Sequence, residues 1–122
     1  MKVAVFGPSS NVTTSDIEKA IISSGYNHTE IILDGMQKRG TSAVAAKWCD
    51  SNDVNYTRLV PDPKMGDGVS GWDIIAAGID SAEAVVIIYN GAGGLYPNMI
   101  SYARSIGRRY FIYPLGEDDE DN

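Results

Sequence analysis

The sequence of 122 residues has only one cysteine, Cys49, and only one histidine, His28. A single cysteine cannot form an internal disulfide and is typical of a reducing compartment, so we expect a cytoplasmic location. One cysteine and one histidine are too few for a structural zinc site, and we expect no metal site. Nothing in the polar segment around His28 (YNHTE) indicates a Ser-His-Asp triad. We therefore assign no catalytic residue from the sequence.

Long apolar runs and clusters of basic residues are also lacking. No run of about 18 apolar residues occurs, so we expect no membrane association through a spanning helix. The opening MKVAVFG is too short for a signal peptide. The formal net charge is −6, but residues 117–121 (EDDED) carry five acids, and the remainder has a charge of −1. Without a basic patch, nucleic acid is not an expected partner. We expect one domain over residues 1–115 and an acidic, disordered tail over 116–122.

Apolar runs bounded by glycine and proline predict five strands that alternate with four helices. The strands are expected at residues 2–6, 31–33, 55–60, 84–89 and 110–113. The spacing Ser15-x-x-Glu18 indicates a capping box for the first helix, which Gly25 ends. Thr41 or Ser42 is expected to cap the second helix. The third helix is expected at 72–79, and the fourth from Pro97 to just before Gly107.

This alternation predicts an α/β fold in three layers, with a five-stranded parallel sheet covered by helices on both faces. The expected strand order is 3-2-1-4-5, in which the first and fourth strands are neighbours. Their connections leave toward opposite faces, and ligands of such sheets bind at that switch point. The loops there are residues 7–11 (GPSSN) and 90–94 (NGAGG), both made of small residues.

Glycines in the loop at 90–94 allow backbone N–H groups to approach a phosphate or a ribose. The alternative is a tight turn between strand and helix with no ligand. The candidate ligand-binding residues of this region are Asn90, Gly91, Ala92, Gly93, Gly94, Leu95, Tyr96 and Asn98. Tyr96 is the preferred stacking partner for a nucleobase, with Trp72 and Tyr89 as alternatives.

The two earlier loops supply the other candidates. After the first strand these are Gly7, Pro8, Ser9, Ser10 and Asn11, and after the second strand they are Gly35, Lys38 and Arg39. The hydroxyl and amide groups of the first loop could bind a ligand or satisfy the loop backbone. The two cations could pair with phosphate or remain solvated. Trp48 and Cys49 are expected to pack in the core, and Arg104 to complement a helix C-terminus.

Three segments carry a resemblance to a known family: KVAVFGPSS, DGMQKRGTSAVAAKWC and SAEAVVIIYNGAGGLYPNMISYA. They resemble the SLOG superfamily of Rossmann-like nucleotide-binding domains, and most of all its small stand-alone branch related to YspA and YpsA. Where the family has Pro-Gly-Gly-x-Gly-Thr before a helix, this chain keeps Gly91, Gly93 and Gly94, with Asn90 for Pro and Leu95 for Thr. The resemblance implies a nucleotide-derived small molecule as partner and a homodimer.

The related Lonely Guy phosphoribohydrolases carry a Glu on the helix after this motif, but here no acid occurs between Glu83 and Glu117. The resemblance therefore implies binding of a nucleotide or nucleotide-derived signal, as a sensor or sponge, without turnover and without a cofactor. One alternative is an N-glycosidic hydrolase or deoxyribosyltransferase-like enzyme that takes its carboxylate from Asp34, Asp73 or Asp80. Another is a protein-interaction module without a ligand.

Overall fold

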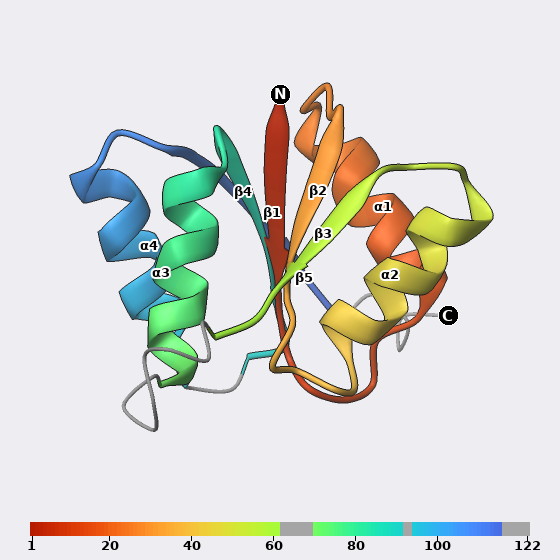
Figure 1. Ribbon diagram of the computed structural model, residues 1–122, viewed down its shortest axis with the longest axis horizontal. Coiled ribbons are helices and arrows are strands. Elements are labelled where there is room, and N and C mark those ends of the chain that lie inside the picture. The colour runs from red at the N-terminus through yellow and green to blue at the C-terminus, as the bar shows by residue number, and fades with distance from the viewer. Residues whose placement is uncertain (62–69, 92–93, 116–122) are drawn as a thin grey trace.

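The computed structural model describes residues 1–61, 70–91 and 94–115. Five parallel strands in the order β3-β2-β1-β4-β5 alternate with four helices in this part of the chain, which confirms the predicted fold class and strand order (Figure 1). The elements are β1 (Lys2–Phe6), α1 (Thr14–Ser24), β2 (Glu30–Asp34), α2 (Thr41–Ser51), β3 (Tyr56–Leu59), α3 (Gly71–Ser81), β4 (Ala84–Tyr89), α4 (Tyr96–Ser105) and β5 (Arg109–Pro114). The predicted acidic tail, 116–122, lies outside the described residues.

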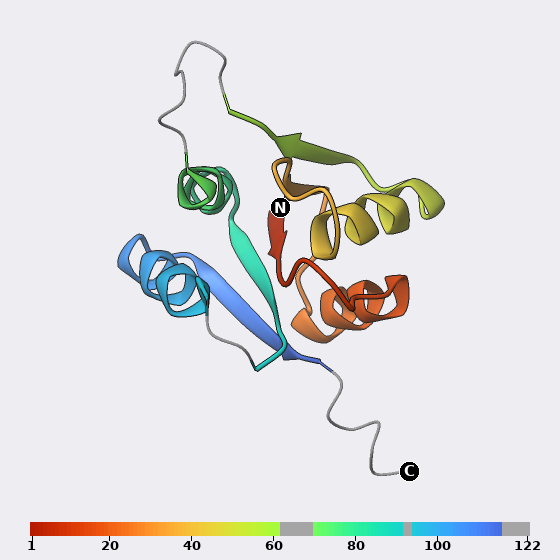
Figure 2. The same cartoon turned by 90° about the horizontal axis from the view of Figure 1, so that it is seen from below.

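Helices cover both faces of the sheet (Figures 1 and 2). The α1 and α2 helices pack on one face around Val3, Val5 and Val86, whereas α3 and α4 pack on the other around Ala4 and Phe6. Alternate residues of the central strands thus enter two separate cores, as expected for strands buried on both faces. The helices have 10 or 11 residues, and within the described chain none is long and apolar enough to cross a membrane.

The central pair of strands determines where the crevice at the edge of the sheet lies. β1 pairs with β4 from Val3↔Ala84 to Phe6↔Ile87, so the two strands end at the same edge of the sheet. The chain leaves β1 toward α1 on one face and leaves β4 toward α4 on the other (Figure 2). The two connections therefore diverge and leave a crevice at the carboxyl ends of the strands.

The start of α1 differs from the prediction. Thr13 is the N-cap: its Oγ1 accepts a hydrogen bond from the Asp16 N–H at 3.1 Å, and Asp16 Oδ2 accepts one from the Thr13 N–H at 2.9 Å. The capping box predicted at Ser15 and Glu18 is wrong, because an aspartate at the third helical position closes the box two residues earlier. Gly25 ends the helix with a φ of 71°, as predicted.

The start of α2 differs as well. The N-cap is Gly40, with a φ of 75° and no side-chain cap, so the prediction that Thr41 or Ser42 caps this helix is wrong. The physical reason is a tertiary contact: the Thr41 N–H and Oγ1–H both donate to the carbonyl oxygen of Pro8, at 3.0 and 2.9 Å. The Thr41 hydroxyl thus ties α2 to the loop after β1. The other boundaries agree with the prediction to within two residues.

Gly40 and Gly25 form a matched pair for testing this contact. Both have a positive φ, but a Cβ at Gly40 would lie 2.3 Å from the backbone carbon of Ser9, whereas a Cβ at Gly25 would meet nothing within 4 Å. Gly25→Ala should cost about 1–2 kcal/mol from backbone strain alone. Gly40→Ala should cost about 3 kcal/mol or more, because strain and a backbone clash add. If urea denaturation shows that both variants lose the same free energy of unfolding, the close contact between Gly40 and the loop after β1 does not matter for stability.

Cys49 and Trp48 occupy the core, as predicted. Both are buried, and the Trp48 Nε1–H donates to Glu18 Oε1 at 3.1 Å, which is the contact that Glu18 makes instead of capping α1. Burial, and to a lesser degree the nearby Asp50 carboxylate, raise the pKa of the Cys49 thiol to about 11. Such a thiol is protonated at neutral pH and is a poor nucleophile.

We expect Cys49 to resist alkylation by iodoacetamide at pH 8 in the folded protein. The raised pKa alone lowers the thiolate fraction by about a hundredfold, and burial blocks access further. In urea the thiol should react at the rate of an unstructured cysteine, as measured by mass spectrometry. Equally fast modification of folded and unfolded protein would show that the thiol is accessible.

Candidate functional site

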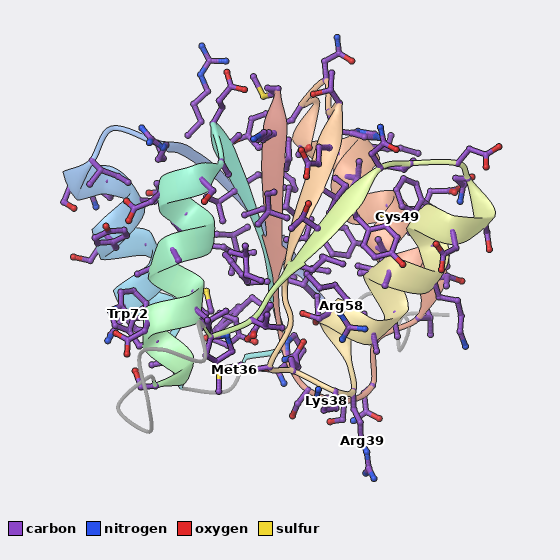
Figure 3. The ribbon with its side chains drawn as sticks, viewed as in Figure 1. Met36, Lys38, Arg39, Cys49, Arg58 and Trp72 are labelled. Atoms are coloured by element: carbon purple, nitrogen blue, oxygen red, sulfur yellow. The ribbon has the colours of Figure 1, made fainter. Side chains whose placement is uncertain are left out.

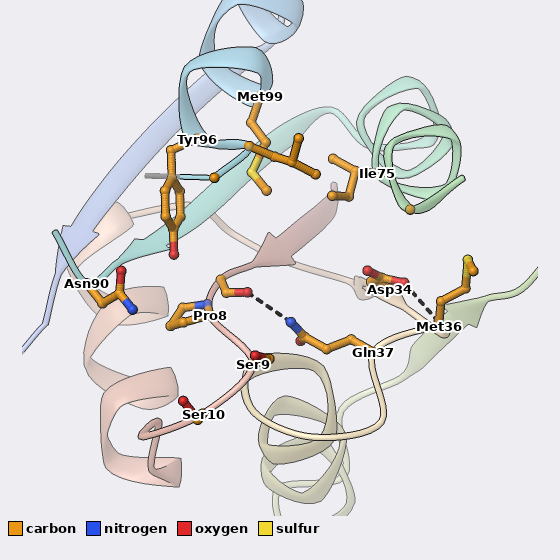
Figure 4. Close-up of a pocket in the computed structure, with 14 residues that line it drawn as sticks. Pro8, Ser9, Ser10, Asp34, Met36, Gln37, Ile75, Asn90, Tyr96 and Met99 are labelled. Carbon is orange, nitrogen blue, oxygen red and sulfur yellow. Dashed lines mark hydrogen bonds between the residues drawn. The ribbon is translucent and has the colours of Figure 1, made fainter. Parts of the chain in front are cut away.

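A cavity of about 560 Å³ opens at the carboxyl ends of β1, β2 and β4, and we call it the switch-point pocket (Figure 4). It lies where the connections of β1 and β4 diverge, as the strand order predicts. Its lining residues are Gly7, Pro8, Ser9, Ser10, Asp34, Met36, Gln37, Gly71, Ile75, Asn90, Gly94, Leu95, Tyr96 and Met99. The loops after β1, β2 and β4, the end of β2 and the N-terminal parts of α3 and α4 thus contribute.

The structure brings together many of the residues singled out in the sequence. Those that line the pocket are Gly7, Pro8, Ser9, Ser10, Asn90, Gly94, Leu95 and Tyr96. The two small-residue loops therefore meet, although whether they hold a ligand stays a prediction. The predicted residues that do not line it are Asn11, Gly35, Lys38, Arg39, Gly91 and Asn98, while Ala92 and Gly93 lie outside the described residues.

Gly35 has a packing role instead of lining the pocket. Its N–H donates to the carbonyl oxygen of Leu59 at 2.7 Å, and a Cβ at this position would lie 2.2 Å from that oxygen. Close approach to a neighbouring strand, and not to the pocket, explains this glycine. Lys38 and Arg39 are exposed in the loop before α2 (Figure 3). Asn98 lines a separate groove on α4 with Trp72 and Tyr102.

The wall formed by the loop after β1 is fixed by α2 and by Gln37. A Cβ at Gly7 would lie 2.4 Å from Thr41 Oγ1, so only glycine fits at this contact. Gln37 Nε2 donates to the carbonyl oxygen of Gly7 at 3.0 Å, while Gln37 Oε1 accepts from the Ser42 N–H at 2.8 Å (Figure 4). One amide side chain thus joins the loop after β1, the loop after β2 and the first turn of α2.

Two hydroxyls remain available on this wall. Ser9 and Ser10 are exposed, and neither side chain has a hydrogen-bond partner among the residues that the structure describes. Because Thr13 caps α1, neither serine performs that structural role. The sequence leaves two roles open for these hydroxyls: to hydrogen-bond the loop backbone or to bind a ligand. The observed hydrogen bonds do not support the first role.

The opposite wall ends in the first turn of α4. Leu95 is the N-cap and makes no side-chain cap hydrogen bond, and Pro97 follows in the first turn without an N–H. Gly94, just before it, has a φ of 90°. Unsatisfied N–H groups and the helix dipole make such a helix end partially positive. Because Gly94, Leu95 and Tyr96 line the pocket, this positive end borders it.

Tyr96 is the aromatic residue of the pocket lining. Its ring packs edge-on against Tyr89, with 4.8 Å between the ring centroids, and the hydroxyl lies between Asn90 and Pro8 in Figure 4. Burial raises the pKa of the Tyr96 phenol, and a hydrogen bond from the Asn90 backbone lowers it by less. The phenol therefore stays protonated at neutral pH. Trp72, a sequence candidate for stacking, packs against Tyr102 outside the pocket.

The three acids considered for catalysis lie in different surroundings. Asp34 lines the pocket, and its Oδ1 accepts from the Met36 N–H at 2.8 Å. Asp73 closes the capping box of α3, accepting from the Ser70 N–H at 2.7 Å. Asp80 accepts from the Tyr102 hydroxyl at 2.7 Å. Asp34 is thus the acid that the switch-point pocket offers within the described chain, and no Lys or Arg accompanies it in the lining.

Sequence reasoning missed several lining residues, namely Met36, Gln37, Gly71, Ile75 and Met99. Ile75 and Met99 follow the apolar periodicity of helices. This periodicity predicts that a residue faces the sheet, but it does not distinguish a core residue from one that lines a pocket. Gln37 lies in a loop, and no sequence pattern there predicts the two hydrogen bonds of its side chain. No set of three or more potential metal-ligating side chains occurs in the described residues.

We expect Gln37→Glu to destabilise the protein by about 1–3 kcal/mol. The substituted side chain can still accept from the Ser42 N–H, but it no longer donates to the Gly7 carbonyl and places a negative charge beside it. Lys38→Ala, at the next, exposed position, should change the free energy of unfolding by less than about 0.5 kcal/mol. Chemical denaturation of both variants tests the difference, and equal effects would contradict the joining role of Gln37.

The chain was compared with protein-family models, with curated proteins and with solved structures. No family model, curated protein or solved structure matches it. The likeness to the SLOG superfamily therefore stays an expectation drawn from three sequence segments.

Proposed function

We propose that the switch-point pocket binds a nucleotide or a nucleotide-derived signalling molecule and does not turn it over. The observation that carries this proposal is the meeting of the loop after β1 with the uncapped first turn of α4. One wall offers the hydroxyls of Ser9 and Ser10, and the other offers backbone N–H groups. Both suit a phosphorylated sugar.

The size and composition of the cavity support a small, partly apolar ligand. A volume of about 560 Å³ lies within the range of small-molecule sites. Ile75 and Met99 supply apolar surface, and Tyr96 supplies an aromatic ring with a polar end. A phosphate would accept hydrogen bonds from the first turn of α4, and a base would pack against the apolar part of the lining.

Binding without turnover is favoured over catalysis by the surroundings of the acids. Cleavage of an N-glycosidic bond needs a carboxylate that stabilises the developing ribosyl cation and a base that activates water. Among the described lining residues Asp34 is the single acid, and one of its oxygens is engaged by the Met36 N–H. A sensor or a sponge requires only the binding walls.

An N-glycosidic hydrolase is the second candidate, and the position of Asp34 in the pocket is the observation that favours it. Incubation with nucleoside 5′-monophosphates and chromatography for free base separates the two functions. Binding without release of base supports the first proposal, and release that Asp34→Asn abolishes supports the second.

Substitutions at two asparagines test where the anionic group lies. Asn90 lines the pocket near the start of α4, whereas Asn98 lies on the same helix but outside the lining. Asn90→Asp should weaken the binding of a nucleoside 5′-phosphate about tenfold or more, because a negative charge then faces the phosphate. Asn98→Asp should change the affinity by less than about threefold. Calorimetric titration measures both, and equal losses would place the anion elsewhere.

Native mass spectrometry of the freshly purified protein tests the proposal without a chosen ligand. We expect a copurified mass in the nucleotide range, bound to a dimer as the family resemblance implies. A thermal-shift screen with nucleotides and cyclic dinucleotides provides the complementary measurement. If no mass copurifies and no compound raises the melting temperature, the pocket has no such ligand and a protein-interaction role is favoured.

A further inference from the structure

We infer that β5 is an interface between two copies of this chain, in which the open edges of two β5 strands pair antiparallel and join their sheets into one. β5 is the last strand in the order β3-β2-β1-β4-β5, and within the described chain its one strand neighbour is β4 (Figure 2). It contributes no residue to the lining of the switch-point pocket, so this interface does not depend on the proposed ligand.

The open edge of β5 presents backbone groups that have no partner in the sheet. The Leu115 N–H donates to the Tyr89 carbonyl oxygen at 2.8 Å, so Leu115 and every second residue before it direct their backbone groups toward β4. Tyr110, Ile112 and Pro114 therefore direct theirs toward the open edge. Because proline has no N–H, the donors available there are those of Tyr110 and Ile112.

These donors determine the register in which the strand can pair with its own copy. Around a two-fold axis, Tyr110 lies opposite the partner's Ile112, and the two residues exchange both of their N–H···O bonds. Phe111 then lies opposite the partner's Phe111 on the axis. A shifted register would place Pro114 or Arg108 opposite one of the donors. Pro114 has no N–H, and the Arg108 N–H is already bonded to the end of α4 at 2.8 Å.

The side chains at the centre of β5 are apolar and belong to neither core. Phe111 is half-buried and Ile112 is 38% exposed, and both are absent from the clusters that the helices cover. In this register Phe111 meets the partner's Phe111 on one face of the joined sheet, and Ile112 meets the partner's Tyr110 on the other. Aromatic pairs and aromatic–β-branched pairs are favourable across antiparallel strands. Pairing thus covers apolar surface that a single copy leaves exposed.

The charges around β5 favour a second copy as the partner. Arg104, Arg108 and Arg109 lie at or just before the start of the strand, whereas the acids at 117–121 follow its end in the sequence. Antiparallel pairing brings the basic start of one strand next to the end of the other, from which the acidic segment continues. It also places Arg109 opposite the partner's Tyr113, a favourable cation–aromatic pair. The strand is therefore complementary to its own antiparallel copy.

The other edge strand, β3, is protected against such pairing. Thr57 and Arg58 at its centre are exposed, and Arg58 Nη2 donates to the Gln37 carbonyl oxygen at 3.0 Å. A charged side chain on an edge strand opposes pairing with another chain. Between Arg109 and Pro114, by contrast, β5 has no charged residue. The two edges of the sheet thus differ in the feature that prevents association.

Ile112→Lys tests the surface, because it places a charge at the centre of each paired strand. Size-exclusion chromatography with light scattering should give the unchanged protein the mass of two chains of 13.1 kDa each. Ile112→Lys should give the mass of one chain, with a dissociation constant raised about a hundredfold or more. Ile22→Lys is the matched control, since Ile22 is 70% exposed on α1, and it should remain a dimer.

A cysteine variant tests the register independently of the stability of Ile112→Lys. Phe111→Cys places two cysteines opposite each other with Cα atoms about 4.5 Å apart, which permits a disulfide. Arg109→Cys, on the same face of the strand, keeps the two new cysteines about 14 Å apart, which does not. Mild oxidation should therefore convert Phe111→Cys, and not Arg109→Cys, into a covalent dimer on non-reducing electrophoresis. Cys49 is buried in both variants.

A monomeric unchanged protein would overturn the inference and leave the proposed function standing. A dimer that survives Ile112→Lys would also overturn it, as would equal disulfide yields from the two cysteine variants, because the interface would then lie elsewhere. A dimer that passes both tests and binds no nucleotide supports the β5 interface and contradicts the proposed function alone.

Discussion

The geometry of the pocket depends on two backbone carbonyl groups, those of Gly7 and Pro8. Both belong to the segment just after β1, and both are held by groups from the next βα unit: Gln37 Nε2 on the first, and the N–H and hydroxyl of Thr41 on the second. Without these bonds the loop would have partly buried carbonyl acceptors without protein donors, which is costly. The loop is therefore fixed before any ligand arrives, and so is the wall that carries Ser9 and Ser10.

The facing wall lacks such side-chain hydrogen bonds, because the first turn of α4 has no side-chain cap. α1 and α3 both close capping boxes, so the chain has the residues to cap helices and uses them elsewhere. The Ser9 and Ser10 hydroxyls on one side and a helix start without a side-chain cap on the other make the crevice chemically asymmetric. That asymmetry, more than volume, restricts which molecules fit.

The strands could be predicted well because burial on both faces leaves a continuous apolar run, and β1 and β4 begin and end where the sequence places them. Their position also predicts the meeting of the two loops. The caps could not be predicted as well, because Thr13, Ser15 and Thr41 have equivalent hydroxyl groups. The local partner Asp16 selects Thr13 as the cap of α1, whereas a tertiary contact with Pro8 engages the Thr41 hydroxyl. Gly35 shows a similar ambiguity: a glycine indicates close approach, but not whether a strand or a ligand approaches. Gln37 carries no local signal at all.

The methionines of the pocket have a consequence of their own. Met36 comes from the loop after β2 and Met99 from α4, and both line the cavity (Figure 4). A thioether chain with three rotatable bonds changes shape without moving the backbone. Part of the apolar surface of the cavity is therefore adaptable in shape. An apolar wall of this kind can adjust to groups of different outline without a shift of the backbone.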